Sequence, residues 1–192
     1  MFEAPVARSP IRQVGPIEIL GGWEVSKKES ANSLRLSDLS PASKLGVKAQ
    51  VSPFAIAYGR SVRIGEWIVA GSGPEEWTLV GPPGGTFDVD TSGFSTVIDI
   101  THGRALLRLT GRQAALVLGK VCPIDLSDNM CPDRAVFRAS VANVVTDVLR
   151  DDVNGIRSYL LHCERSSGQF LFDTLLDAGA EFAIDVEGFR WP

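Results

Sequence analysis

The stretch LRLTGRQAALVLGKVCPIDL (Leu107–Leu126) contains the change of periodicity that decides the fold class. Apolar and polar residues alternate before Gly111, as is typical of a strand, and a helical apolar stripe follows it. The stripe is formed by Ala114, Ala115, Leu118 and Val121. Glycine lets the chain turn at the strand end, and Pro123 ends the helix because a proline disfavours helical geometry at Cys122. The stretch therefore predicts a strand followed directly by a helix over residues 111–121.

After Ser95, segments with the alternation of a strand and segments with the apolar stripe of a helix follow one another along the chain. Strands are predicted at residues 96–100, 105–109, 136–142, 144–149, 158–162 and 181–186, and a second helix is predicted at residues 168–178. This order favours an antiparallel sheet with both helices on one face. The sequence therefore predicts an α+β fold with a ferredoxin-like βαββαβ module over residues 95–192.

A smaller β-rich part is predicted over residues 34–94. Short strand-like runs separated by Gly, Pro and Ser occur at residues 55–58, 61–64, 66–70 and 76–80. The sequence GPPGG at residues 81–85 predicts a turn or hinge. Trp67 and Trp77 each follow a glutamate. Packing in the core or across strands is the first interpretation of these two side chains, and an interface anchor is the second.

An extended N-terminal arm is predicted over residues 1–33. Its first part is rich in Pro and Gly and contains short apolar pieces such as residues 17–20, which cannot form a core by themselves. Two roles remain open for the arm. It is either a disordered leader or a segment that becomes ordered along a partner surface, and its apolar content favours the second role.

Composition excludes several classes of protein. The chain has 192 residues, is 44% hydrophobic and carries a formal net charge of −4 without a cluster of Lys and Arg, which argues against a nucleic-acid surface. No apolar run is long enough to span a membrane, and the first residues do not resemble a signal peptide, so we expect a cytoplasmic protein. The three cysteines are expected to be buried free thiols.

A search for catalytic motifs predicts no catalytic, cofactor-binding or metal-binding residues. The chain has only two histidines, and His162 and Cys163 are adjacent strand residues, which point to opposite faces. The glycine-containing stretches match no phosphate-binding motif. The carboxylates of Asp147, Asp151 and Asp152 lie close in sequence, and we interpret them as solvated loop charges.

Three phrases nevertheless form a pattern in a defined order. They are LRLSDLSPASKLGVKA (residues 34–49), EEWTLVGPPG (residues 75–84) and VIDITHGRALLRLTGRQAALVLGKVCPIDL (residues 97–126). Together they resemble the gamma subunit family of heterotetrameric sarcosine oxidase. The resemblance extends over about residues 34 to 186.

That family is in turn similar to the amino-terminal part of the glycine-cleavage T-protein superfamily, whose full-length members bind tetrahydrofolate. The resemblance implies that residues 34–192 form an aminomethyltransferase-like domain of this folate-binding superfamily. The superfamily phrase Gly-x-Ile-x-Asp-Asp corresponds here to NVVTDV, in which Asn143 replaces the glycine, Val148 replaces the second aspartate and Asp147 is retained. The middle stretch around Cys131 also departs from the gamma subunit pattern. A different N-methyl amine is therefore an open possibility for the substrate of the parent complex.

The resemblance implies a non-catalytic gamma subunit that holds no cofactor. Its partners would be larger alpha and beta subunits, which hold FAD, FMN, NAD and tetrahydrofolate, and a small delta subunit. Such a complex oxidatively demethylates an N-methyl amino acid and transfers the one-carbon unit to tetrahydrofolate. Interface energy is concentrated in buried aromatic residues, so the candidate interface anchors are Trp23, Phe54, Tyr58 and Trp191.

Two alternatives remain. The first is a stand-alone tetrahydrofolate-binding protein with Asp147 near the pterin ring. The second is a non-enzymatic scaffold or interaction protein.

Overall fold

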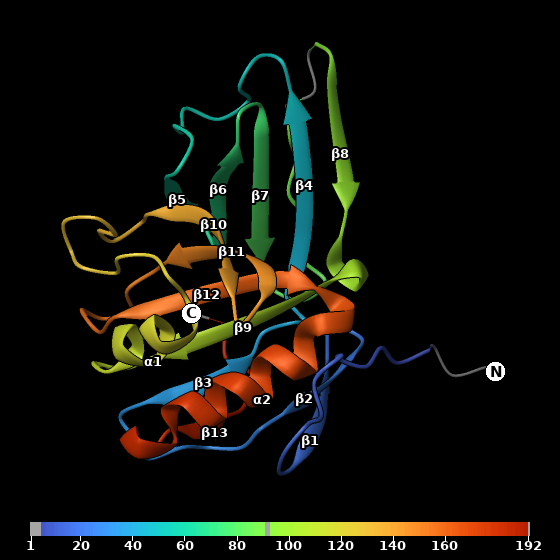
Figure 1. Ribbon diagram of the computed structural model, residues 1–192. Coiled ribbons are helices and arrows are strands. Elements are labelled where there is room, and N and C mark those ends of the chain that lie inside the picture. The colour runs from blue at the N-terminus through green and yellow to red at the C-terminus, as the bar shows by residue number, and fades with distance from the viewer. Residues whose placement is uncertain (1–4, 91–92, 192) are drawn as a thin grey trace.

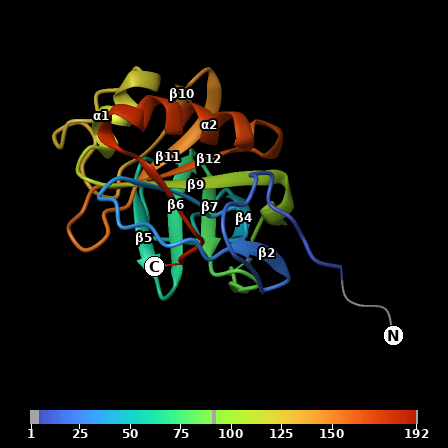
Figure 2. The ribbon, with the colours of Figure 1, turned by 90° about the horizontal axis from the view of Figure 1, so that it is seen from below.

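The computed structural model describes residues 5–90 and 93–191 and has three layers (Figures 1 and 2). Two helices cover one face of a six-stranded sheet, and a five-stranded sheet packs on its other face. The chain is a mixed α+β protein, mostly β, with two α-helices in the described part. None of the helices described is long and apolar enough to cross a membrane.

The six-stranded sheet has the order β10 (Val136–Val141), β11 (Val144–Arg150), β12 (Ser158–Glu164), β9 (Arg104–Thr110), β3 (Arg35–Asp38) and β13 (Asp185–Glu187). The five-stranded sheet has the order β5 (Ser61–Ile64), β6 (Trp67–Gly73), β7 (Glu76–Gly81), β4 (Ser43–Ala49) and β8 (Ser95–Asp99). The helices are α1 (Ala114–Val121) and α2 (Gly168–Gly179), and β1 (Ile17–Leu20) and β2 (Trp23–Ser26) form a separate hairpin.

The strand period of two divides the core between the layers. Leu107 and Leu161 pack with the helices, whereas their neighbours Leu106 and Leu160 pack with the five-stranded sheet. All four side chains are fully buried, and burying one leucine side chain contributes about 1.5–3 kcal/mol. The central strands are apolar on both faces because the sheet is covered on both sides.

The stretch around Gly111 forms the predicted strand and helix, but α1 begins at Ala114 and not at residue 111. Gly111 has φ +148°, and a Cβ atom on it would lie 2.6 Å from the carbonyl oxygen of Ser33. The backbone of Gly111 thus passes close to that of Ser33, and residues 112–113 complete the turn before α1. As predicted, the helix ends before Pro123, with Cys122 in extended geometry.

Two predicted strands are wrong in their position. Residues 55–58 form no strand because local bonds hold this segment, such as Ile56 N–H to Phe54 O at 2.8 Å. At residues 181–186, a 3-10 turn over Ala180–Phe182 comes first, Ala183 has φ +53°, and the strand begins at Asp185. Hydrophobic alternation alone does not reveal such turns.

The predicted N-terminal arm is part of the fold. Ile11 and Trp23 are buried, and the arm forms the β1–β2 hairpin. Residues 1–4 of the arm, 91–92 and 192 lie outside the described residues. This packing results from long-range contacts that the local sequence does not encode.

The sheets do not separate at the predicted boundary between residues 94 and 95. β3 lies in the six-stranded sheet, where it inserts between β9 and β13, whereas β8 lies in the five-stranded sheet. Three strands, not the two of a βαββαβ plan, lie between α1 and α2. The sheet that a strand joins depends on its tertiary contacts. The local sequence pattern of β3 or β8 therefore does not predict it.

Candidate functional site

A cleft of about 190 Å³ lies between the two sheets. Arg138, Asp147 and His162 line it on the six-stranded sheet. Residues of β4, β7 and β8 line the opposite side, among them Lys48, Thr78 and Ile98. The cleft is thus lined by polar and charged as well as apolar residues, and Arg138, Asp147 and His162 form one polar cluster in it.

The polar cluster forms a row across three neighbouring strands. The register pairs Asp147 of β11 with Arg138 of β10 and with His162 of β12. Arg138 Nε donates to Asp147 Oδ1 at 2.6 Å and Nη2 donates to Oδ2 at 3.3 Å. His162 Nδ1 lies 3.5 Å from Asp147 Oδ2, beyond ordinary hydrogen-bond length. The antiparallel register therefore brings together three groups that are 9 to 24 residues apart in the sequence.

The environment fixes the charges of this row. Burial raises the pKa of Asp147, but the contacts with His162 and Arg138 outweigh it and hold this pKa below the usual range. Burial lowers the pKa of His162, although the Asp147 carboxylate acts in the opposite direction. Asp147 is therefore ionised and His162 neutral at neutral pH.

This arrangement is suited to holding a polar group rather than to acid–base catalysis. The Asp147 carboxylate is already engaged by a bidentate guanidinium, and an ionised carboxylate with a lowered pKa is a weak base. Both ring nitrogens of His162 are buried without a hydrogen-bond partner in the described part of the chain. Within the described residues, no group of three His, Cys, Asp or Glu side chains could hold a metal ion.

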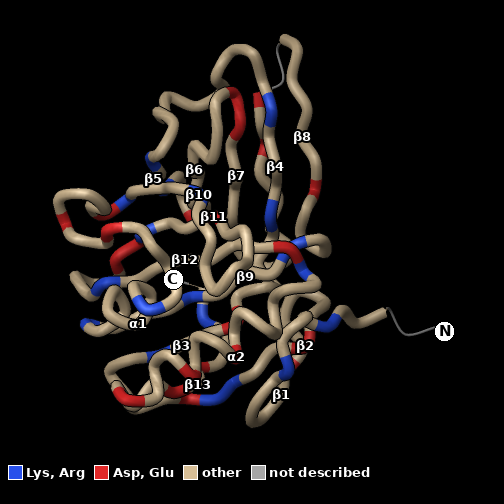
Figure 3. The backbone as a smooth tube through the Cα atoms, in the orientation of Figure 1, with Lys and Arg blue, Asp and Glu red and all other residues tan. Residues whose placement is uncertain are grey.

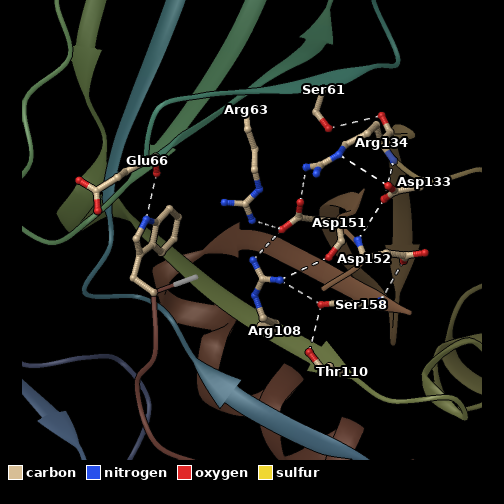
Figure 4. A network of polar contacts seen from close by, with 11 residues as sticks. Ser61, Arg63, Glu66, Arg108, Thr110, Asp133, Arg134, Asp151, Asp152 and Ser158 are labelled. Atoms are coloured by element: carbon tan, nitrogen blue, oxygen red, sulfur yellow. Dashed lines mark hydrogen bonds and ion pairs between the residues drawn. The ribbon is translucent and has the colours of Figure 1, made fainter. Parts of the chain in front are cut away.

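A second polar cluster joins the two sheets around Asp151 (Figure 4). Its carboxylate contacts Arg63 of β5 at 2.7 Å, Arg108 of β9 at 2.9 Å and also Arg134. The Asp151 side chain is fully buried, so its interpretation as a solvated loop charge is wrong. The available signal was Arg108, which interrupts the leucines of the strand RALLRLT (residues 104–110).

The four candidate interface anchors occupy different environments. Trp23 is 4% exposed and stacks on His102 with ring centroids 4.7 Å apart, and Phe54 is 8% exposed in the core. Trp191 is partly buried and donates from Nε1 to Glu66 O at 3.0 Å. Tyr58 is 63% exposed. Burial within the chain leaves Tyr58 as the candidate with most of its side chain accessible.

Other side chains lie where the sequence predicted. Trp67 and Trp77 are buried in one cluster with Phe54, as their first interpretation predicted. All three cysteines are buried free thiols. Cys163 packs on the helix side of the sheet and His162 lines the cleft on the other side, so the adjacent pair does not form a catalytic dyad.

No protein-family model matches the sequence. The gamma subunit of sarcosine oxidase from Corynebacterium sp. (strain P-1) is 25% identical over 180 residues, which cover 84% of this chain and 87% of the relative. The chain is a homologue of the sarcosine oxidase gamma subunit. Human mitochondrial dimethylglycine dehydrogenase is 29% identical over 125 residues, 63% of this chain and 14% of that enzyme.

Solved structures share the fold. The chain matches heterotetrameric sarcosine oxidase from Corynebacterium sp. U-96 with a TM-score of 0.66 and 22% identity, over 82% of this chain and 89% of that chain. Aminomethyltransferase T of the glycine cleavage system from Bartonella henselae also has a TM-score of 0.66, with 16% identity, over 90% of this chain and 55% of that chain. The fold is therefore T-protein-like.

Proposed function

We propose that this chain is a non-catalytic gamma subunit of a sarcosine oxidase-like complex. The observation that carries the proposal is the similarity to a sarcosine oxidase gamma subunit over 84% of this chain and 87% of that relative. In the proposed complex, the larger alpha and beta subunits hold FAD, FMN, NAD and tetrahydrofolate, and a small delta subunit completes the assembly. The complex is cytoplasmic and oxidatively demethylates an N-methyl amino acid such as sarcosine, with transfer of the one-carbon unit to tetrahydrofolate.

The state of Asp147 supports a role without its own folate chemistry. Ligand pockets usually have volumes of about 300–1,000 Å³, whereas the cleft beside Asp147 has about 190 Å³. The negative charge of the Asp147 carboxylate is also balanced by the Arg138 guanidinium, which donates to it at 2.6 Å. The small cleft and the engaged carboxylate support the proposal that this chain holds no tetrahydrofolate of its own.

Purification of the chain at its native expression level tests the proposal. The chain is tagged and isolated, and the co-purifying proteins are analysed by mass spectrometry and by absorbance. We expect two larger chains and a flavin spectrum. A colourless monomer in repeated preparations would contradict the proposed complex.

Stand-alone folate binding is the second candidate, because Asp147 lines a cleft in a T-protein-like fold. Titration of the isolated chain with tetrahydrofolate, followed by calorimetry, separates the two functions. The proposed subunit shows no saturable binding. Binding that is saturable, and that is lost in Asp147→Ala but kept in the exposed control Asp177→Ala, would favour the second candidate.

A further inference from the structure

β8 is an open edge of the five-stranded sheet. Its strand partner among the described residues is β4, and Figure 1 shows it at the outer side of the sheet. The opposite edge, β5, is covered by the chain itself, since Ser61 N–H donates to Arg134 O and Val136 N–H donates to Gly59 O, both at 2.9 Å. In the part of the chain that the structure describes, one edge is thus covered and the other is open.

The register shows which backbone groups of β8 point outward. Ile100 N–H donates to Lys44 O at 2.9 Å, and β4 and β8 pair antiparallel with Gly46 opposite Ile98. Antiparallel pairs alternate between hydrogen-bonded and non-hydrogen-bonded residues. Thr96 and Ile98 therefore bond to β4, and the N–H and C=O groups of Val97 point away from it.

An independent hydrogen bond gives the same alternation. Ala49 N–H donates to Glu75 O at 3.1 Å, on the β7 side of β4. Ala49 faces Ser95 across the other side of β4. Ser95, like Val97 and Asp99, then directs its N–H and C=O groups to the open edge.

The open edge carries little of the usual protection against strand pairing. Natural edge strands carry Lys, Pro or bulges that prevent association, whereas the β8 sequence STVID contains only one charged residue, Asp99 (Figure 3). Phe94, just before β8, is 83% exposed, and Ile98 is 55% exposed. Outward backbone groups and apolar side chains together select an extended, apolar peptide segment.

The size of the edge decides which kind of molecule supplies this segment. Five residues at about 3.4 Å each give a strand of roughly 17 Å, and a sheet is about 10 Å thick. Pairing between two copies through β8 alone would bury on the order of 350 Å² in total, well below the roughly 1,000 Å² of a specific interface. A strand at this edge therefore has to belong to a larger contact surface.

We propose that a strand of one of the larger partner subunits adds to β8 in the assembled complex. The added strand bonds to the outward groups of Ser95, Val97 and Asp99, and its apolar side chains cover Phe94 and Ile98. This inference rests on the proposed function, because it requires the larger subunits.

Hydrogen exchange tests the inference directly. The exchange of β8 amides is measured by mass spectrometry in the isolated chain and in the purified flavin-containing complex. A backbone hydrogen bond formed on association slows the exchange of its amide, so we expect at least about tenfold slower exchange at Val97 and Asp99 in the complex. Equal exchange in both states would overturn the inference. Protection that appears in the free chain as its concentration rises would identify a second copy as the occupant and would also overturn it.

A pair of substitutions at one position isolates the outward N–H group. Val97→Pro removes it without removing a bond to β4, whereas Val97→Ala keeps it. Loss of one such hydrogen bond corresponds to about tenfold weaker association of the Pro variant with the larger subunits. Equal association of the two variants would contradict strand addition. Thermal unfolding of each free variant shows whether the chain remains folded.

Failure of the inference is distinguishable from failure of the proposed function. If no flavin-containing chains accompany the protein, the proposed function is wrong and the inference falls with it. If the complex forms and β8 remains unprotected, the function stands and only the inference is wrong.

Discussion

Arg108 and Asp151 form an ion pair with 2.9 Å between Nη2 and Oδ2, and their side chains are 7% and 0% exposed. Arg63 and Arg134 bind the same carboxylate from other segments. Burial raises the pKa of Asp151, but the guanidinium groups of Arg108 and Arg63 outweigh it and lower this pKa below the usual range. The carboxylate therefore holds the two sheets together as an anion.

Asp151→Asn removes this anion and leaves three guanidinium groups facing a neutral side chain. Breaking a buried ion pair from one side costs about 3–5 kcal/mol, and the partial exposure of Arg63 and Arg134 places our expectation at the lower end. Urea unfolding measures the loss, and Asp177→Asn on the exposed side of α2 is the control, expected to change stability by less than about 0.5 kcal/mol. Equal stability of the two variants would show that Asp151 does not join the sheets.

Lys44 is predicted to make stability depend on pH. Its side chain is fully buried, and Nζ donates to Ser40 O and Ala42 O at 2.7 Å each. Burial lowers the pKa of Lys44 from 10.5 to about 7, although Asp38 and Asp99 act to raise it. Between these two values the unfolded chain binds a proton that the folded chain has released.

The free energy of unfolding should therefore rise with pH from about 7 towards 10.5, by up to about 1.4 kcal/mol per pH unit. Below about pH 7 the lysine is protonated in both states and contributes no slope. Lys44→Met removes the titrating group, so the difference between wild type and variant in urea unfolding isolates its contribution. Parallel pH profiles for the two proteins would refute the assignment.

His162 is predicted to make stability depend on pH in a lower range than Lys44 does. Burial lowers its pKa below 6.5 in the folded chain, so on acidification the unfolded chain takes up the proton first. Stability should fall as the pH drops below 6.5, and His162→Leu should weaken this dependence. The free energy of unfolding of the two proteins is compared near pH 5 and near pH 7.5. At the higher pH, His162 is mostly neutral in both the folded and the unfolded chain, so the effect should be absent there. An identical fall in both proteins would mean that other groups cause it.

Gly111→Ala is predicted to destabilise the turn between β9 and α1. The new Cβ would lie 2.6 Å from Ser33 O at a φ of +148°, and we expect a loss of at least about 2 kcal/mol. Gly119→Ala is the matched control inside α1, where a Cβ meets nothing within 4 Å. That substitution should stabilise the helix by up to about 1 kcal/mol. Thermal unfolding of both variants tests the contrast, and similar losses would exclude the proposed clash.

Local sequence patterns predicted the helices and strands that have a clear apolar periodicity. β9, α1, β10, β11, β12 and α2 lie at or near the predicted residues. Each has a clear apolar period and a strong boundary, such as Gly111 and Pro123 around α1. In the first half, β5, β6 and β7 also lie at or near the predicted residues. In contrast, β3 and β4 were not predicted, because β3 is short and β4 contains a glycine and a buried lysine.

The candidate site was only partly predictable. Asp147 was selected through a family resemblance, but nothing in its local sequence indicates Arg138 and His162 as partners. These contacts depend on the register of β10, β11 and β12. The burial of Asp151 was missed because a pair of adjacent aspartates is usually solvated.

The sequence by itself determined the α+β class, the helix after Gly111, the buried thiols and the opposite orientations of His162 and Cys163. These properties depend on residue period and chain stiffness, which act over a few neighbouring residues. Only the tertiary structure decided that β3 belongs to the six-stranded sheet and β8 to the five-stranded sheet. It also decided that Trp23 and Phe54 are core residues and that three arginines meet at Asp151. Burial and charge pairing depend on segments far apart in the chain, and their free energies are set only when those segments meet.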